Sequence, residues 1–207
     1  KEVETPEIQN PSDVLINTGF DAINQACDSI WNKLANDLTT ELALKSINIG
    51  ISTLPNILSR QLGSNDRTLL ALTSLYAGIC IANTKTSICH SISYPLTAHF
   101  NIPHGIACAF TMPSVLDFCL EKDDGRFLKL AKNFGITDNY KSKLKTIFKS
   151  LNEQFEIIEL IKKRIKNENQ LLKLIHEMYD PSRADNLIRK VKFSDIELIL
   201  KESYNQI

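Results

Sequence analysis

The sequence predicts an all-α fold, and three observations support this prediction. Apolar residues recur with the helical period along most of the chain, the alternating patterns of strands are missing, and glycine is scarce, at 7 of 207 residues. Hydrophobic residues make up 43% and charged residues 23% of the chain, as in ordinary globular proteins. We therefore expect one helical bundle.

Long helices are expected in the first half of the chain. Thr18 and Asp21 suggest a helix that starts near Thr18. The apolar pattern from Thr39 to Leu62 predicts a buried helix that bends where Pro55 removes a backbone donor.

Two further helices are expected downstream. The segment from Asp66 to Ala82 is apolar nearly all round and rich in small residues, which is typical of a helix at the centre of a bundle. Residues from Gly105 to Leu120 predict another apolar helix, with a kink at Pro113.

The hydrophobic pattern changes after residues 121–125, and a boundary between two subdomains is one interpretation of this change. Shorter amphipathic segments follow, at 127–134, 140–151, 155–166 and 170–179. The run Asp180-Pro181-Ser182 predicts a break, and Ser194 with Glu197 predicts the start of a last helix. We expect a polar segment at 1–10 and one all-helical metal-binding domain at 11–207.

Composition excludes several classes of function. Lys plus Arg and Asp plus Glu both number 24, so the basic surface of a nucleic-acid-binding protein is not expected. Neither common glycine-rich phosphate loop is present, and no apolar run has the length of a membrane span. The five cysteines form no C-x-x-C pair, which favours free, mostly buried thiols in the reducing cytoplasm.

The candidate chemistry centres on two of the four histidines. His90 lies on a short apolar helix, and His104 lies at the turn that opens the next one. Asp21 lies on an earlier apolar helix, with Gln25 on the same face. An aspartate and two histidines from three elements are a plausible site for a divalent metal. The alternative is that all three residues are structural: Asp21 as an acid at a helix start, His90 as a hydrogen-bonded core residue and His104 as a turn residue.

A polar loop, Asn83-Thr84-Lys85-Thr86-Ser87, precedes the helix that bears His90. Its backbone N–H groups, hydroxyls and ammonium would suit an anionic group on a substrate, with Thr84, Lys85 and Thr86 as the contacts. An N-capping loop with a solvated lysine is the alternative.

These segments together resemble the C-terminal domain of iron-containing (group III) alcohol dehydrogenases. The resemblance is carried by Thr18-Gly19-Phe20-Asp21-Ala22, by Leu75-Tyr76-Ala77-Gly78, and by the H-x13-H spacing that ends in Pro103-His104-Gly105. The segment from Asp185 to Tyr204 is similar to the closing helix of the family.

The resemblance implies a set of metal ligands at Asp21, Gln25, His90 and His104. The family has histidine at the position of Gln25, so three of its four ligands match, and either Fe²⁺ or Zn²⁺ is open. Many family members carry a further histidine at the position of Tyr94, whose hydroxyl is then a candidate for proton relay.

The resemblance also implies a reaction. In such enzymes the metal polarises a substrate carbonyl, and NAD(P)H delivers hydride to the carbon. Gln25, Tyr94 and the Asn-Thr-Lys-Thr run resemble the phosphonoacetaldehyde reductases within the family, so an anionic aldehyde is an expected substrate. The nucleotide-binding domain is expected on another part of a longer enzyme or on another chain, so this chain should be inactive alone.

Two other function classes remain open at this point: a metal-dependent helical hydrolase and a non-catalytic interaction domain that keeps the fold. The hydrolase class usually has an adjacent His-Asp pair, which this sequence lacks. Neither a nucleic acid nor a membrane is an expected partner, and a homo-oligomer stays open.

Overall fold

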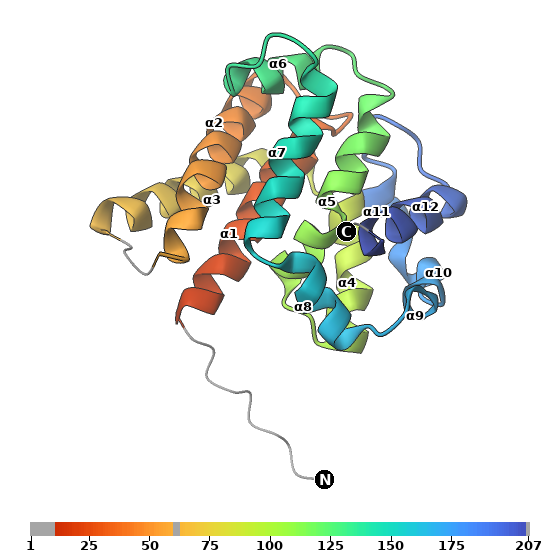
Figure 1. The fold of residues 1–207 in the computed structure, drawn as a ribbon. Helices are drawn as coiled ribbons and strands as arrows, with labels where there is room; N and C mark the ends of the chain where they lie inside the picture. The colour runs from red at the N-terminus through yellow and green to blue at the C-terminus, as the bar shows by residue number, and fades with distance from the viewer. Residues whose placement is uncertain (1–10, 60–62, 206–207) are drawn as a thin grey trace.

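All regular secondary structure in residues 11–59 and 63–205, the part that the computed structural model describes, is helical (Figure 1). One isolated antiparallel bridge joins Asn32 to Leu187. The predicted all-α class is confirmed. The polar segment 1–10 lies outside the described residues. None of the helices in the described part has the length and apolar character that a membrane crossing needs.

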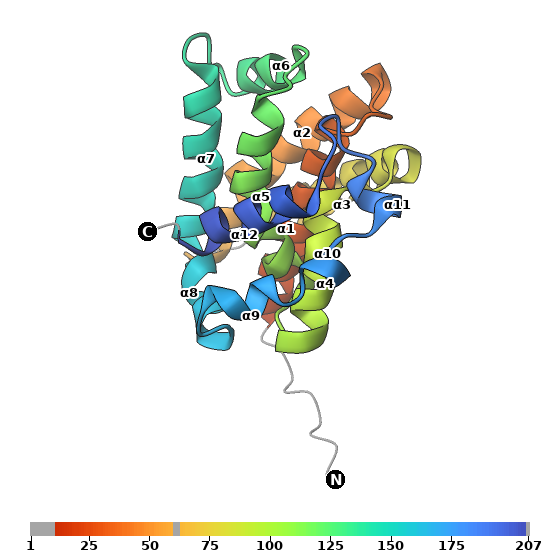
Figure 2. The same ribbon diagram turned by 90° about the vertical axis from the view of Figure 1, so that its right-hand side faces the viewer.

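Helix α1 (Pro11–Ile30) lies in the middle of the bundle (Figures 1 and 2). It packs against α2 (Asp37–Thr53) and α3 (Ser64–Thr84) on one side. It packs against α5 (His104–Leu120) and α4 (Ile88–Phe100) on the other. A side chain on α1 can therefore meet side chains from both halves of the bundle.

The predicted start of the first helix is wrong. Helix α1 begins at Pro11, whose fixed φ suits a first helical position. Thr18 lies in its interior, where the hydroxyl donates to the carbonyl of Val14 at 2.8 Å instead of capping a helix start.

The predicted long helix from Thr39 to Leu62 is shorter than expected. Helix α2 ends at Thr53, and a 3₁₀ turn at Leu54–Ile57 carries Pro55 in its first turn. Proline has no N–H to continue the α-helical ladder, so the chain tightens instead of bending. Residues 60–62 of the expected helix lie outside the described residues.

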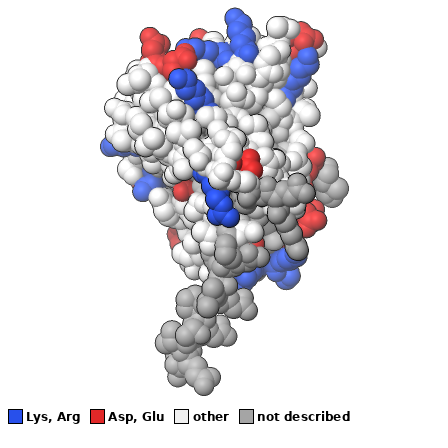
Figure 3. All heavy atoms as spheres, turned by 90° about the vertical axis from the view of Figure 1, so that its left-hand side faces the viewer, with Lys and Arg blue, Asp and Glu red and all other residues white. Residues whose placement is uncertain are grey.

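Helix α3 forms as predicted but lies at the surface. Its buried residues Thr73, Ala77 and Cys80 face the bundle, while Leu75 and Ile79 are 55% and 39% exposed. Figure 3 views the molecule from the side on which α2 and α3 lie in Figure 1, and the middle of this face carries few charged side chains. An apolar pattern all round the helix thus did not place it at the centre.

The central buried helix is α5, in which every side chain from Gly105 to Leu120 except Asp117 is buried. Pro113 has no N–H, so the carbonyl of Ala109 loses its partner one turn back. The buried side chain of Asn152 supplies a donor to that carbonyl at 2.7 Å. This bond from outside the helix satisfies a polar group that the proline would leave unpaired.

The second half of the chain covers α5 with short helices (Figure 2). They are α6 (Arg126–Asn133), α7 (Tyr140–Gln154), α8 (Ile157–Arg164), α9 (Glu168–Leu172), α10 (Ile175–Met178), α11 (Pro181–Ala184) and α12 (Phe193–Tyr204). The segment 170–179 is thus divided between two helices. Helix α12 is capped by the backbone N–H of Lys192 on Asp195, not by the predicted pair Ser194 and Glu197. One hydrophobic core continues across residues 121–125.

Arg126 fixes the C-terminal end of α1. Its Nη1 donates to the carbonyl oxygens of Ile30 at 2.8 Å and Asn32 at 2.7 Å. A cation at this end satisfies open carbonyl groups and complements the helix dipole. These bonds connect the start of α6 to the C-terminal end of α1.

Gly105 allows α5 to approach α1 closely. A Cβ atom at this position would lie 1.8 Å from the carbonyl oxygen of Asn17 and 2.9 Å from the backbone nitrogen of Asp21. The Gly105 N–H donates to Oδ1 of Asn17 at 2.7 Å. The start of α5, with His104, is thus held directly against the turn of α1 that carries Asp21.

We predict that Gly105→Ala lowers the free energy of unfolding by about 3 kcal/mol, because two backbones must separate to admit one methyl group. Gly78→Ala is the control, since a Cβ on that helical glycine meets nothing within 4 Å. It should stabilise the protein by about 0.5–1 kcal/mol. Urea unfolding followed by circular dichroism measures both, and equal effects would contradict the packing argument.

Candidate metal centre

Asp21, His90 and His104 come together in the structure. Oδ1 of Asp21 lies 3.3 Å from Nε2 of His90 and 3.6 Å from Nε2 of His104. The sulfur of Cys108 joins them, and the four donor atoms all lie within 4.8 Å of one another. Three of the four predicted ligand positions therefore present donor atoms to one point.

Asp21 lies well inside α1, and His104 is the first residue of α5. A carboxylate in the middle of a helix gains little from the helix dipole, which acts within the terminal turns. The alternative that Asp21 is only a helix-start acid therefore fails. The side chain instead faces the two imidazoles, which come from two other helices.

The ring of His90 is oriented by a second carboxylate. Its Nδ1 lies 2.8 Å from Oδ2 of Asp28, and the side chain of His90 is only 2% exposed. An N–H on Nδ1 donates to Asp28, so Nε2 is the nitrogen that faces Asp21 and that can bind a cation once its proton is displaced. A buried carboxylate behind a histidine is the arrangement that orients metal-binding imidazoles in proteins.

Asp28 is a residue of the candidate centre that the sequence reasoning missed. It is fully buried and accepts hydrogen bonds from Nε1 of Trp31 at 2.9 Å and from the backbone N–H of Ser87 at 2.7 Å. The hydroxyl of Ser87 donates to Oδ1 of Asp28, the oxygen that also accepts from Trp31. The available signal was the spacing, because Asp28 follows Asp21 by seven residues and lies on the same helical face.

His104 is oriented in the same sense by a hydroxyl. Its Nδ1 lies 3.3 Å from Oγ of Ser93, and that hydroxyl donates to the carbonyl of His90 at 2.8 Å. Because the hydroxyl proton is used, Ser93 accepts the N–H from Nδ1 of His104. Nε2 of His104 then faces Asp21, as Nε2 of His90 does.

Gln25 contacts the centre through its amide group. Nε2 of Gln25 donates to Oδ2 of Asp21 at 2.9 Å, one turn along α1. The structure thus places Gln25 behind the carboxylate, where it holds Asp21 in one orientation.

Tyr94 lies on the exposed side of the centre. Its ring stacks on that of His104, with centroids 5.3 Å apart, and its side chain is 45% exposed. The guanidinium of Arg183 lies over the same Tyr94 ring, 4.8 Å from its centroid. A phenol and a cation therefore border the site on the side that solvent reaches.

The polar loop before α4 is bound to the end of α1. Thr84 is fully buried, and its hydroxyl contacts Ser29 at 2.7 Å and the carbonyl of Cys80 at 3.1 Å. Lys85 has a positive φ of 63° and an exposed side chain, and Thr86 is half-buried. The Thr84 hydroxyl therefore holds the loop in place, while Lys85 stays open to solvent.

The cysteines agree with the predicted free, buried thiols, and the two remaining histidines lie outside the centre. His99 is 44% exposed and lies 2.7 Å from Glu177, and His176 is exposed. All five cysteines are free and buried.

Mutual electrostatics distinguishes the centre from the rest of the core. Burial alone lowers the pKa of His90, but Cys108 and the carboxylates of Asp21 and Asp28 outweigh burial and raise this pKa well above its usual value. A hydrogen bond with Cys108 raises the pKa of His104. Burial tends to raise the pKa of Cys108, yet the two imidazoles outweigh it and lower the pKa of that thiol. A cation that binds here must displace protons.

The donor set fits a divalent transition metal. Two imidazole nitrogens are borderline ligands and the sulfur is a soft one, and together with one carboxylate oxygen they suit zinc or iron better than magnesium or calcium. The exposure of Asp21 and His104, at 28% and 30%, leaves one side of the centre open to a substrate.

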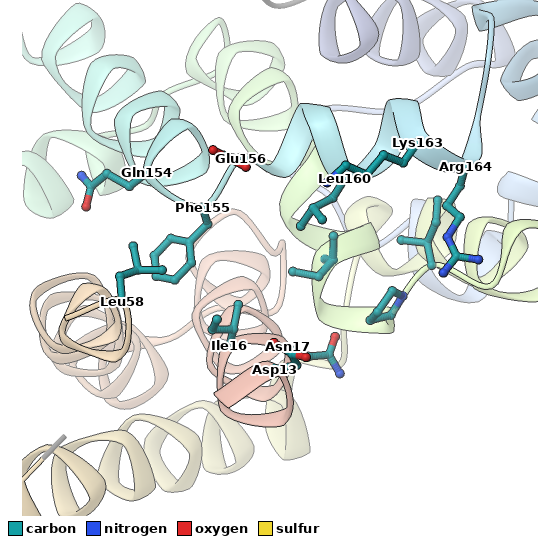
Figure 4. A pocket seen from close by; sticks show the side chains of 13 residues that line it. Asp13, Ile16, Asn17, Leu58, Gln154, Phe155, Glu156, Leu160, Lys163 and Arg164 are labelled. Carbon is teal, nitrogen blue, oxygen red and sulfur yellow. The ribbon is translucent and has the colours of Figure 1, made fainter. Parts of the chain in front are cut away.

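A cavity of about 580 Å³ opens next to the start of α5 (Figure 4). Pro103 and Ile106, which flank His104 in the chain, line it, as do Asn17 of α1 and Lys163 of α8. The four donor residues are not among its lining residues. The cavity and the metal centre are therefore neighbouring sites separated by the first turn of α5.

We predict that Asp28→Asn lowers zinc affinity by about 10–100-fold, because the amide no longer accepts the His90 N–H as a carboxylate does. Calorimetric titration with zinc measures the affinity. Asp123→Asn is the matched control, since Asp123 accepts bonds from Gly125 and Tyr140 away from the centre. If both variants bind zinc like the wild type, Asp28 does not orient a ligand.

Comparison with known proteins agrees with this geometry. The profile described as "Fe-containing alcohol dehydrogenase family, C-terminal" matches residues 15–204. The alcohol dehydrogenase of Thermococcus barophilus is 25% identical over 194 residues, which cover 93% of this chain and 48% of that protein. The NADPH-dependent butanol dehydrogenase of Clostridium saccharobutylicum is 28% identical over 156 residues, which cover 73% and 40%.

Solved structures show the same fold. A 1,3-propanediol oxidoreductase superimposes with a TM-score of 0.84 at 23% identity, over 95% of this chain and 53% of that one. Sulfoacetaldehyde reductase from Bifidobacterium kashiwanohense gives 0.80 at 21% identity, over 95% and 52%. This chain spans about half or less of the length of these proteins. By the match of its sequence over residues 15–204, the chain belongs to the iron-containing alcohol dehydrogenase family and corresponds to the family's C-terminal domain.

Proposed function

We propose that this chain is the metal- and substrate-binding domain of an NAD(P)-dependent alcohol dehydrogenase that reduces small aldehydes. The observation that carries the proposal is the convergence of Asp21, His90 and His104, with both imidazoles oriented so that Nε2 faces the same carboxylate oxygen. Satisfied core histidines alone do not require two rings from different helices to share one acceptor.

Each side chain has a distinct role in this proposal. Asp21, His90 and His104 hold a divalent cation, Fe²⁺ or Zn²⁺, which when bound supplies Lewis-acid polarisation of the substrate carbonyl. Asp28 keeps the donor lone pair of His90 in position. Tyr94, stacked on His104 and open to solvent, is placed to pass a proton from its hydroxyl to the alcohol product.

The hydride source in this proposal is NAD(P)H on a nucleotide-binding domain. The butanol dehydrogenase relative is named NADPH-dependent, and another relative, from Bacillus methanolicus, is named an NAD-dependent methanol dehydrogenase. Such a domain is the expected protein partner of this chain, and the present residues supply the metal and the substrate contacts.

The proposed substrate is a small aldehyde that carries an anion, with phosphonoacetaldehyde as the specific candidate. Two cations support this choice: Lys85 on the loop before α4, with Thr86 beside it, and Arg183 above Tyr94. Arg183 also pairs with Asp180, which leaves part of its guanidinium fork for an anion. Thr84 serves the loop rather than the substrate.

The first test is the metal content of the chain purified without chelator or affinity nickel. We expect close to one equivalent of iron or zinc in the wild type and loss of that metal in His90→Ala, because the variant removes a metal donor and one hydrogen-bond donor of Asp28. His99→Ala is the control, since that exposed imidazole lies outside the centre.

Absence of metal in the wild type, even after incubation with iron and zinc, would refute the proposed enzyme domain. It would favour the alternative of a non-catalytic domain that keeps the fold.

A second prediction concerns the anion. With the chain joined to the nucleotide-binding domain of a relative, Lys85→Ala and Arg183→Ala are compared on phosphonoacetaldehyde and on propanal. At least one of these two variants should raise the KM for phosphonoacetaldehyde about tenfold or more, because it removes a charge-assisted hydrogen bond to the anion. The KM for propanal should stay unchanged. Equal effects on both aldehydes, in both variants, would exclude an anionic substrate.

A further inference from the structure

Cys108 is the one donor of the centre that the sequence reasoning did not single out. It follows His104 by one turn of α5, and its sulfur lies 3.8 Å from Nε2 of His104. The sulfur also lies within 4.8 Å of the donor atoms of Asp21 and His90. The other four thiols lie in the core outside this cluster.

Three of the distances among these atoms are close to those of a tetrahedral site. With metal–nitrogen and metal–oxygen bonds of about 2.0–2.1 Å and a metal–sulfur bond of about 2.3 Å, two N or O donors lie ~3.3 Å apart, and S lies ~3.6 Å from N. The structure has 3.3 and 3.6 Å between Asp21 and the imidazoles, and 3.8 Å between Cys108 and His104. These three contacts need shifts of only a few tenths of an ångström, and the remaining donor pairs lie within 4.8 Å of each other.

The backbone holds the sulfur in this position. The buried amide of Asn24 donates to the carbonyl oxygen of Cys108 at 3.2 Å, which fixes the register of α5 against α1. Cys108 is fully buried, while Asp21 and His104 are partly exposed. The thiol therefore lies at the bottom of the centre, opposite the side that solvent reaches.

A fourth donor is needed from somewhere other than Gln25. The amide nitrogen of Gln25 donates to Asp21, so this side chain is engaged with the carboxylate. An amide oxygen is also a harder and weaker ligand than imidazole for zinc or iron. The sulfur of Cys108 is a strong ligand for the same metals and is already in place.

We propose that Cys108 is a metal ligand in this protein and replaces the donor that Gln25 does not supply. The metal–sulfur bond forms as the S–H bond breaks, and the proton leaves to solvent. Thiolate favours zinc over harder cations such as magnesium and manganese. A substrate oxygen would add to these four donors as a fifth ligand from the exposed side, which Tyr94 borders. This inference rests on the proposed metal-binding function.

The test is X-ray absorption at the zinc edge on the zinc-loaded 207-residue chain. We expect one sulfur at about 2.3 Å in the wild type, and only nitrogen and oxygen at about 2.0–2.1 Å in Cys108→Ser. Zinc affinity should fall about tenfold or more in that variant. Cys119→Ser is the matched control, because Cys119 is equally buried in the same helix but lies outside the cluster.

Gln25→His combined with Cys108→Ser provides a second readout. The added imidazole should restore zinc binding to the serine variant, with nitrogen and oxygen as the only neighbours of the metal. Because the wild-type spectrum is measured independently, a misfolded variant does not decide the result.

The outcomes separate this inference from the proposed function. Zinc bound by the wild type with no sulfur neighbour overturns the role of Cys108 and leaves the metal-binding domain intact. A wild type that binds neither zinc nor iron overturns both.

Discussion

The hydrogen bonds that the buried carboxylate of Asp28 accepts are the interactions on which the candidate metal centre depends most. A charged group with no exposed surface is costly unless every lone pair direction finds a donor. Asp28 receives donors from Trp31, from the backbone and hydroxyl of Ser87, and from His90. One side chain thereby joins α1 to the start of α4 and orients an imidazole of the candidate centre.

A second constraint acts at the other imidazole, and it is steric. Gly105 lets the backbone of α5 touch that of α1, so His104 starts its helix beside Asp21. The two constraints are independent: one fixes His90 by hydrogen bonding, and the other fixes His104 by close packing. The donor atoms meet because α1 lies between them and takes part in both contacts.

In the proposed centre one ligand differs from the set that the family resemblance implies. Gln25 occupies the position at which the family resemblance implies histidine, and in the structure its amide supports Asp21. The neighbouring sulfur of Cys108 stands one helical turn from His104, on the buried side. A change of one ligand type alters metal preference through softness and charge, without any change in the helices that carry the site.

The sequence determined the class of fold, most helices and the donors Asp21, His90 and His104, because helical periodicity is local and the H-x13-H spacing is specific. The surface position of α3 was decided by packing, which periodicity does not report. The places of Asp28 and Cys108 beside the imidazoles were likewise decided by tertiary structure. An aspartate or a cysteine on an apolar helix becomes part of a metal centre only when other helices bring imidazoles within a few ångströms of it.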